Sequence, residues 1–309
     1  MRLRLVPQDT HVGFIGLRRI AYVISAIAII ASIALFGARG LNYGIDFQGG
    51  TLIEVGTEGP ADIARMRSTL NGLGLGDVQI QEFGAANDVL IRVEQQAGGD
   101  EVQQSVVDIV KDALNANFDG ITYRRVEVVG PKVSSELIEA GALAVILAVV
   151  AVLIYIWLRF EWQFSVGAVV ALVHDVVLTI GVFAGLGLEF NLSIIAAILT
   201  IVGYSLNDTV VVYDRVRENL RKYKKKPLHD LLDLSLNETL SRTVMTSVTT
   251  LLALSALYIF GGEVIRGFTF AMIWGVLVGT YSSIFVASPI LLAIGVKRDW
   301  SKAAAEARP

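Results

Sequence analysis

The chain has 309 residues, of which 54% are hydrophobic and 18% are charged, and its formal net charge at pH 7 is −3. The apolar share is high for a soluble domain, so the composition argues against an ordinary soluble enzyme. The sequence has no cysteine, which excludes a disulfide framework and any metal site built on thiolates.

Six segments are long and apolar enough to cross a membrane as helices, since a hydrocarbon core about 30 Å thick requires about 20 helical residues. No small-residue cleavage pattern follows the first segment, so it is predicted to be a retained anchor and not a signal peptide. The last segment contains Pro289, where the helix is expected to end or bend. Two glycine pairs, Gly181–Gly185 and Gly275–Gly279, predict faces where helices pack closely. The predicted spans are residues 18–37, 137–157, 164–185, 191–213, 243–261 and 267–294.

A polar segment, residues 38–136, separates the first span from the second and is long enough for one small domain. Its hydrophobic patterns predict six elements in the order strand, helix, strand, strand, helix, strand. This βαββαβ order indicates a ferredoxin-like α+β domain, a fold that hosts many unrelated functions. The predicted strands are 51–55, 78–83, 88–93 and 121–129, and the predicted helices are 61–73 and 101–118.

Lys and Arg concentrate on one side of the predicted bundle, which is the cytoplasmic side by the positive-inside rule. We therefore expect residues 1–17, a basic loop at 214–242 and the tail 295–309 to be cytoplasmic, and residues 38–136 to be periplasmic. Leucines between 228 and 236 predict a short amphipathic helix at the membrane surface within that loop. The basic residues are Arg2, Arg4, Arg18, Arg19, Arg215, Arg217, Arg221, Lys222, Lys224, Lys225, Lys226, Lys297, Arg298, Lys302 and Arg308.

Four ionisable residues, His174, Asp175, Asp208 and Arg242, fall within the predicted spans or at their edges, where such residues are rare and usually face protein or water. Asp208 in the fourth span and Arg242 at the start of the fifth enter from the same side, so antiparallel helices can pair them. A nearby guanidinium favours the charged carboxylate, and this support is lost when the groups separate. Such a pair can bind and release a proton as the helices move. A static ion pair that locks two helices is the alternative.

The residues next to these groups have simpler interpretations. Asn207 and Thr209 flank Asp208 and are expected to form hydrogen bonds between helices. His174 either bonds a neighbouring helix or takes part in proton transfer. Adjacent helical residues point about 100° apart, so His174 and Asp175 are not expected to form a metal site by themselves.

The sequence lacks the motifs of the enzymes that membrane aspartates can indicate. Tyr213-Asp214 supplies one half of an aspartyl intramembrane protease pattern, but no GxGD motif lies on a neighbouring span to complete it, and the sequence has no Gly-x-Ser-Gly motif and no HExxH motif. A GxxxxGK[ST] phosphate-binding loop is also absent from the sequence, so ATP is not expected to be the energy source. We therefore expect no enzymatic activity and no cofactor. An ion gradient is the expected energy source, since one charge crossing 100 mV supplies about 2.3 kcal/mol.

Four motifs carry a family resemblance over nearly the whole chain: GIDFQGG at 44–50, His174-Asp175, GYSLNDTVVVYDRVREN at 203–219 and LSRTVMTSVTT at 240–250. Together they resemble the SecD/SecF family of bacterial protein-export membrane proteins, within the resistance-nodulation-division superfamily. The resemblance implies that the six spans are half of a twelve-helix bundle completed by a SecD half. It further implies association with the SecYEG channel, and often with YajC and YidC.

In this family the complex uses the proton motive force to draw exported polypeptide out of the channel on the periplasmic side. The resemblance places the proton-path aspartate at Asp208 and the buried arginine at Arg242. It also implies a motif at the base of the periplasmic domain that couples the domain to the spans. The residues of this domain-coupling motif are Gly44, Asp46, Phe47, Gly49 and Gly50.

Two other functions stay open at this stage. One is half of a proton-driven exporter of small molecules or lipids from the same superfamily, although such exporters usually carry both halves on one chain. The other is a structural scaffold of the channel, which would need no Asp and Arg in the membrane. The sequence does not distinguish H⁺ from Na⁺ as the coupling ion.

Overall fold

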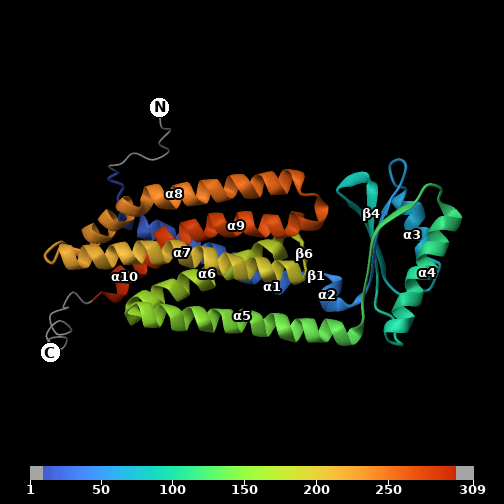
Figure 1. Ribbon diagram of the computed structural model, residues 1–309, viewed down its shortest axis with the longest axis horizontal. Coiled ribbons are helices and arrows are strands. Elements are labelled where there is room, and N and C mark those ends of the chain that lie inside the picture. Colours follow the sequence, from blue (N-terminus) through green and yellow to red (C-terminus); the bar gives the residue numbers. More distant parts are fainter. Residues whose placement is uncertain (1–9, 297–309) are drawn as a thin grey trace.

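The computed structural model describes residues 10–296 and consists of a helical bundle with a small α/β domain at one end (Figure 1). Six helical stretches within it are long and apolar enough to cross a membrane. They confirm the predicted polytopic helical protein with an α+β domain between its first two spans. The basic residues at positions 2, 4, 297, 298, 302 and 308 lie outside the described residues.

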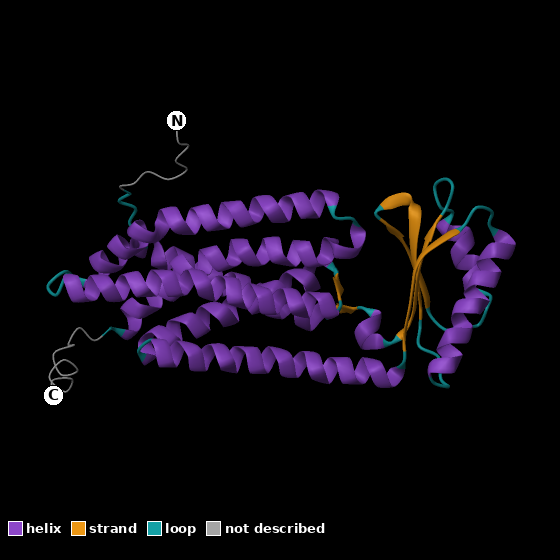
Figure 2. Ribbon diagram, in the orientation of Figure 1, coloured by secondary structure: helices purple, strands orange, loops and turns teal. Residues whose placement is uncertain are grey.

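The spans pack side by side, with the domain beyond one end of the bundle (Figure 2). The connection between the fourth and fifth spans lies at the opposite end, as does the last helix (Figure 1). The first span follows a 3₁₀ turn, η1 (Ile15–Leu17), and a second such turn, η2 (Glu263–Ile265), precedes the last span. The spans are α1 (Arg18–Arg39), α5 (Pro131–Arg159), α6 (Trp162–Leu186), α7 (Leu192–Lys222), α8 (Leu228–Phe260), and α9 (Arg266–Ser282) continued by η3 (Ser283–Ala287) and α10 (Ser288–Ile294).

The last span changes its helical geometry before the proline. η3 is a π-helical turn, and Pro289 follows it in the first turn of α10. A proline has no N–H and therefore cannot make the usual hydrogen bond to the carbonyl four residues earlier. Ser288 Oγ donates to the Ser283 carbonyl oxygen over 2.9 Å, which satisfies one of the backbone acceptors in the wider turn. The expected disturbance near Pro289 is thus a π turn within a continuous helix.

Most of the segment expected to be a basic loop is helical. α7 continues to Lys222 and α8 begins at Leu228, so only residues 223–227 connect the two helices. At about 1.5 Å per residue, α7 and α8 are longer than a hydrocarbon core requires. The two helices therefore extend past the membrane as one hairpin.

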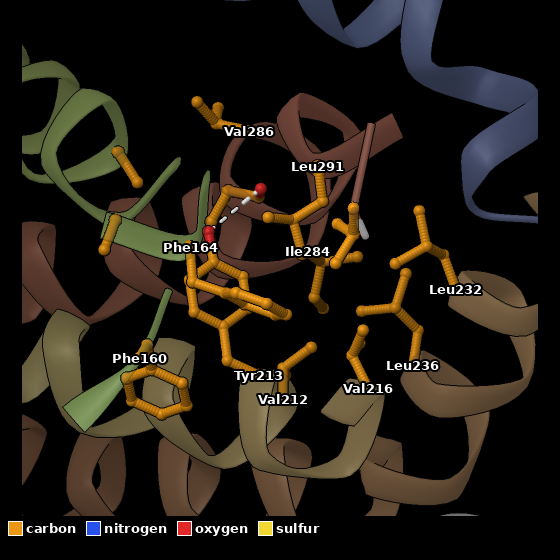
Figure 3. Packing of buried hydrophobic residues seen from close by; sticks show 14 of the residues in the cluster. Phe160, Phe164, Val212, Tyr213, Val216, Leu232, Leu236, Ile284, Val286 and Leu291 are labelled. Atoms are coloured by element: carbon orange, nitrogen blue, oxygen red, sulfur yellow. Dashed lines mark hydrogen bonds between the residues drawn. The ribbon is translucent and has the colours of Figure 1, made fainter. Parts of the chain in front are cut away.

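The leucines expected to lie on the membrane surface are instead part of a protein core. Leu232 and Leu236 of α8 pack with Val216 of α7 in a cluster that also holds aromatic residues of α6 and α7 (Figure 3). Within the same cluster, Tyr213 donates a 3.1 Å hydrogen bond to the Ala287 carbonyl oxygen. The prediction of a separate interfacial helix is wrong, because the apolar stripe of this segment finds an apolar partner on the extended part of α7.

The segment before the first span is held against the same hairpin. The Asn237 side chain on α8 accepts a hydrogen bond from the Val12 amide over 2.9 Å and donates one to the Val12 carbonyl oxygen over 2.8 Å. Asp233 Oδ1 accepts from the Ile15 amide over 2.8 Å, which satisfies a free donor at the start of η1. The hairpin and the start of the first span thus form one unit.

The domain between α1 and α5 has the predicted element order. Its sheet is antiparallel, with strand order β3-β4-β2-β5, and two helices connect the strands (Figure 2). Residues from the helices and one sheet face form its core, including Ile53, Met66 and Val110. The elements are β2 (Gly50–Gly56), α3 (Ile63–Asn71), β3 (Val78–Phe83), β4 (Ala85–Val93), α4 (Asp100–Asn117) and β5 (Thr122–Val129). This is the expected ferredoxin-like arrangement.

Both predicted glycine pairs lie where two spans pack closely. A Cβ at Gly181 of α6 would overlap Ser32 of α1, and one at Gly275 of α9 would overlap Ile201 of α7. One at Gly279 would lie 3.0 Å from the Ser205 Cβ atom, also on α7. Close approach of α9 to α7 therefore depends on the absence of side chains at these positions.

Replacing Gly275 should separate α9 from α7 and lower stability. We expect Gly275→Val to destabilise the fold by about 1–3 kcal/mol, because the added atoms must displace Ile201. Gly37→Val is the matched control, since nothing lies within 4 Å of a Cβ at that position of α1. The measurement is the temperature at which half of the detergent-purified protein remains monodisperse. Equal values for the two variants would contradict the proposed packing.

Candidate functional site

Asp208 lies inside the bundle, where three helical elements meet. It is on α7, its residue is 8% exposed, and its carboxylate accepts hydrogen bonds from two hydroxyls. Thr243 Oγ1 on α8 donates to Oδ1 over 2.6 Å, and Ser283 Oγ on η3 donates to Oδ2. A buried carboxylate requires such partners, because an unsatisfied one is strongly destabilising.

Arg242 does not contact this carboxylate. It is exposed on α8, and no ion pair within 4 Å joins it to Asp208 in residues 10–296. It lies near enough to interact electrostatically with Asp208. Arg242 points away from Asp208 because Thr243, the next residue of α8, faces inward, and consecutive helical residues point about 100° apart. The expected pair is thus replaced by a hydroxyl contact, with the guanidinium outside.

Of the two residues flanking Asp208, only one is inside the bundle. Thr209 is 2% exposed, whereas Asn207 lies on the outer surface of α7. The Asn207 side chain makes no hydrogen bond to any residue that the structure describes. Its expected role between helices therefore needs a helix from outside this chain.

His174 and Asp175 form a second buried polar cluster on α6. The two residues are 2% and 1% exposed, and His174 Nδ1 lies 2.9 Å from Asp175 Oδ1. Ser205 Oγ of α7 and Ser282 Oγ of α9 both donate to Asp175 Oδ2, over 2.5 Å and 2.8 Å. Across the described chain, no three His, Asp or Glu side chains are grouped closely enough to hold a metal ion.

The motif GIDFQGG forms the junction between the bundle and the domain. It follows a short strand, β1 (Asn42–Tyr43), and forms one helical turn, α2 (Ile45–Gln48). β1 pairs in parallel with β6 (Glu189–Phe190), the connection between α6 and α7, and the Gly44 amide donates to the Phe190 carbonyl oxygen over 2.9 Å. The domain is therefore attached to the two helices that carry the buried acids.

Asp46 links the motif directly to the helix of Asp208. Its Oδ2 atom accepts a hydrogen bond from the Leu192 amide over 2.8 Å. Leu192 is the first residue of α7, and its amide has no partner within the helix. A carboxylate at this position also interacts favourably with the helix dipole. One residue of the motif therefore caps α7 from outside the helix.

The other motif residues hold this connection in place. The Phe47 ring packs on Phe190 with ring centres 6.1 Å apart. Gly49 and Gly50 have φ values of +72° and +110°, and a Cβ on Gly50 would overlap the Val93 carbonyl oxygen. These glycines allow the chain to turn from α2 into the sheet next to β4.

Two further contacts tie the domain to the bundle. Arg92 of β4 forms a 2.9 Å ion pair with Glu189 of β6. A Cβ at Gly84, in the turn between β3 and β4, would overlap Glu263 of η2. Between the two contacts lies a cavity of about 380 Å³, lined by sheet residues such as Leu52 and bundle residues such as Phe268. The domain therefore touches the bundle at its edges and leaves space beneath the sheet.

The hydroxyl partners of the two acids were not predicted from the sequence. Ser205, Thr243, Ser282 and Ser283 are common residues in membrane helices, and only their place in the packed bundle distinguishes them. The one sequence feature that could have pointed to them is their closeness to the candidate residues, since Thr243 follows Arg242 and Ser205 precedes Asp208 by one turn. The arrangement as a whole can transmit a change of charge at Asp208 to α7, α8 and η3, and through α7 to the domain junction.

Comparison with known proteins identifies the family. Residues 109–297 match the model described as "Protein export membrane protein SecD/SecF, C-terminal", and residues 34–61 match the "SecD/SecF GG Motif". The protein translocase subunit SecF of Rickettsia rickettsii is 46% identical over 97% of this chain and 97% of its own length. That of Cereibacter sphaeroides is 48% identical over 97% of this chain and 95% of its own length.

Two solved structures share the fold. The crystal structure of SecDF from Thermus thermophilus, described as a translocon-associated membrane protein, superposes with a TM-score of 0.84 at 34% identity. A SecDF structure in a super-membrane-facing form gives a TM-score of 0.70 at 35% identity. These matches cover 95% and 99% of this chain but only 40% and 42% of the solved chains. By its sequence and its fold, the chain belongs to the SecD/SecF family of protein-export membrane proteins.

Proposed function

We propose that this chain is an accessory subunit of the Sec translocase, which acts with a SecD-type half to promote polypeptide translocation and release at the periplasmic side. The proposed energy source is the proton motive force, with Asp208 as the group that binds and releases the proton. No enzymatic step or cofactor is part of this proposal. The observation that carries it is a buried carboxylate whose only hydrogen-bond partners among residues 10–296 are hydroxyls on two other helical elements.

Protonation of Asp208 must change these contacts. An ionised carboxylate can accept from both Thr243 and Ser283, whereas a protonated carboxyl group carries a donor on one of its oxygens. At least one hydroxyl must then turn from donor to acceptor or move away. Proton binding thus alters the contacts of α7 with α8 and η3, whereas a static helix lock would need no titratable group at this point.

The outer faces of α7 and α8 support a second half as partner. The exposed residues of α7 at intervals of three and four are small or polar, and an exposed guanidinium lies on α8. Small residues favour close helix packing, and an arginine facing lipid is unfavourable. These exposed residues are Ser193, Ala196, Thr200, Gly203 and Asn207 on α7, and Arg242, Thr246 and Thr249 on α8. A SecD-type bundle that covers this face can also supply a group to Arg242.

The partners beyond that half are proposed from the family alone. They are the SecYEG channel, YajC, YidC and the exported polypeptide itself. We place the chain in the bacterial inner membrane, with both termini in the cytoplasm and residues 38–136 in the periplasm. The distribution of basic side chains supports this orientation, since the Arg- and Lys-rich connection between α7 and α8 lies at the end of the bundle away from the domain (Figure 1).

The domain junction supplies a path from the proton site to the periplasm. α7 carries Asp208 within the bundle, and its first amide is held by Asp46. A movement of α7 therefore acts directly on the base of the domain. Half of a small-molecule exporter could contain the same proton site, but the relatives from Rickettsia rickettsii and Cereibacter sphaeroides, which match this chain over 97% of its length, are named as translocase subunits.

Asp208→Asn should abolish the contribution of the gradient to export. The variant keeps the shape of the side chain but cannot bind and release a proton at neutral pH, so export with a gradient should fall to the level measured without one. The measurement is translocation into inverted membrane vesicles with the gradient imposed and collapsed. Asp214→Asn is the matched control on the same helix, since Asp214 pairs with Arg159 at the exposed end. Undiminished stimulation in Asp208→Asn would remove this residue from the mechanism.

Asp46→Ala should weaken the coupling between α7 and the domain. Loss of a helix cap lowers stability by about 1 kcal/mol, and here it also removes a contact across the junction. Asp62→Ala is the matched control, because Asp62 caps α3 within the domain by accepting from the Arg65 amide over 3.0 Å. We expect similar losses of thermal stability from both variants and a loss of gradient-driven export from Asp46→Ala alone. Equal export in the two variants would argue against a coupling role for Asp46.

A further inference from the structure

Two consecutive serines connect the two buried acids. Ser282, the last residue of α9, donates to Asp175 on α6 over 2.8 Å, and Ser283, the first residue of η3, donates to Asp208 on α7. Both serines are fully buried. The same backbone segment therefore holds one acid on each of two different helices.

The π-helical geometry begins at this point of the last span. η3 starts at Ser283, and the Ser283 carbonyl oxygen accepts from Ser288 Oγ over 2.9 Å. A π turn is a wide turn whose hydrogen-bond pattern can shift, and such turns occur often at functional sites. A change in the bonds of Ser282 is thus transmitted to Ser283 through a segment that can adjust.

α7 provides a second connection between the acids. Ser205 donates to Asp175 over 2.5 Å and lies three residues before Asp208, on the same side of the helix. Asp175 is therefore bonded to residues of α7 and α9 that are next to Asp208 or to its partner. The hydrogen bonds of the two acids are thus joined through the backbone, by the Ser282–Ser283 step in the last span and by one turn of α7.

The histidine beside Asp175 gives this cluster a proton-binding group. His174 Nδ1 lies 2.9 Å from Asp175 Oδ1, and the ring stacks on Tyr281 with centres 5.9 Å apart. His174 Nε2 is buried and has no hydrogen-bond partner among the described residues. A buried polar atom without a protein partner is unusual in a static structural cluster. Imidazole is the side chain whose unperturbed charge changes between pH 5 and 8.

We propose that His174 and Asp175 are a second proton-binding site of this chain, coupled to Asp208 through Ser282 and Ser283. The site without its proton is a neutral imidazole beside a carboxylate, and the loaded site is an imidazolium–carboxylate pair. The net charge of the pair changes from −1 to zero when one proton binds at a ring nitrogen. This inference rests on the proposed function, because it assigns the residues that communicate with Asp208.

The charges around the two sites explain the coupling. The ionisable groups inside this network in the described structure are His174 and Asp175 on α6, Asp208 on α7 and Tyr281 on α9. Arg242 lies on the outside of α8 but is near enough to interact electrostatically with Asp208. Two carboxylates in a membrane bundle repel each other when both are charged. Loading His174 and Asp175 removes that repulsion, so the proton content of one site changes the proton affinity of the other.

The test measures the titration of Asp208 by infrared spectroscopy. The full chain, assembled with its SecD-type partner in lipid nanodiscs, is titrated with pH, and the carboxyl band that disappears in Asp208→Asn is assigned to Asp208. We expect Asp175→Asn and His174→Gln to shift the midpoint of this band by about one pH unit or more, a tenfold change in proton affinity. Ser282→Ala, which removes a single hydroxyl from the connection, should produce a smaller shift.

Ser247→Ala is the matched control, because Ser247 bonds the Thr280 hydroxyl over 2.7 Å between α8 and α9 and contacts neither acid. It should leave the midpoint unchanged. An unchanged midpoint in Asp175→Asn and His174→Gln overturns the proposal and leaves a structural role for the cluster. If these variants do not assemble, Ser282→Ala decides the question, and a midpoint equal to that of Ser247→Ala overturns the proposal.

The export assay separates this inference from the proposed function. If Asp208→Asn loses gradient-driven export while Asp175→Asn and His174→Gln keep it in full, the function stands and the second site is wrong. If Asp208→Asn keeps gradient-driven export, the proposed function fails, whatever the infrared midpoints show.

Discussion

The burial of an ionisable carboxylate among membrane helices is the constraint on which the rest of the bundle depends. Asp208 can occupy its position only if hydrogen-bond donors surround it, and the donors come from α8 and from η3. This requirement sets how α7, α8 and the last span rotate against one another. Glycines at positions 275 and 279 bring α9 close enough to α7 for the contact to form. The polar site and the close apolar packing around it therefore depend on each other.

Composition and periodicity were sufficient to predict the architecture of the chain. Runs of about 20 apolar residues define membrane spans by a length requirement that tertiary structure does not alter, and strand and helix periods define the βαββαβ domain. The limits of the spans were less predictable, because an amphipathic segment such as 228–236 can lie on a membrane or on another helix. The leucines alone do not distinguish these two surfaces, and Val216 on the extended part of α7 decides the outcome.

The buried acids were also predictable as candidates, since ionisable residues are rare in spans, but their partners were not. Arg242 and Thr243 are neighbours in sequence, and a rotation of about 100° decides which of them faces Asp208. That rotation depends on all the contacts along α8. The same reasoning applies to Asp46, whose motif indicated a role at the base of the domain but gave no sign of the amide it would bind.

The length of α7 has a mechanical consequence. Its 31 residues form a continuous helix about 46 Å long, anchored at one end by a side chain of the domain base and at the other end by the packed hairpin with α8. A rigid rod of this length acts as a lever, and a tilt of about 5° displaces one end by about 4 Å relative to the other. A small tilt of α7 about Asp208, near its middle, is thus enough to move the base of the domain by ångströms.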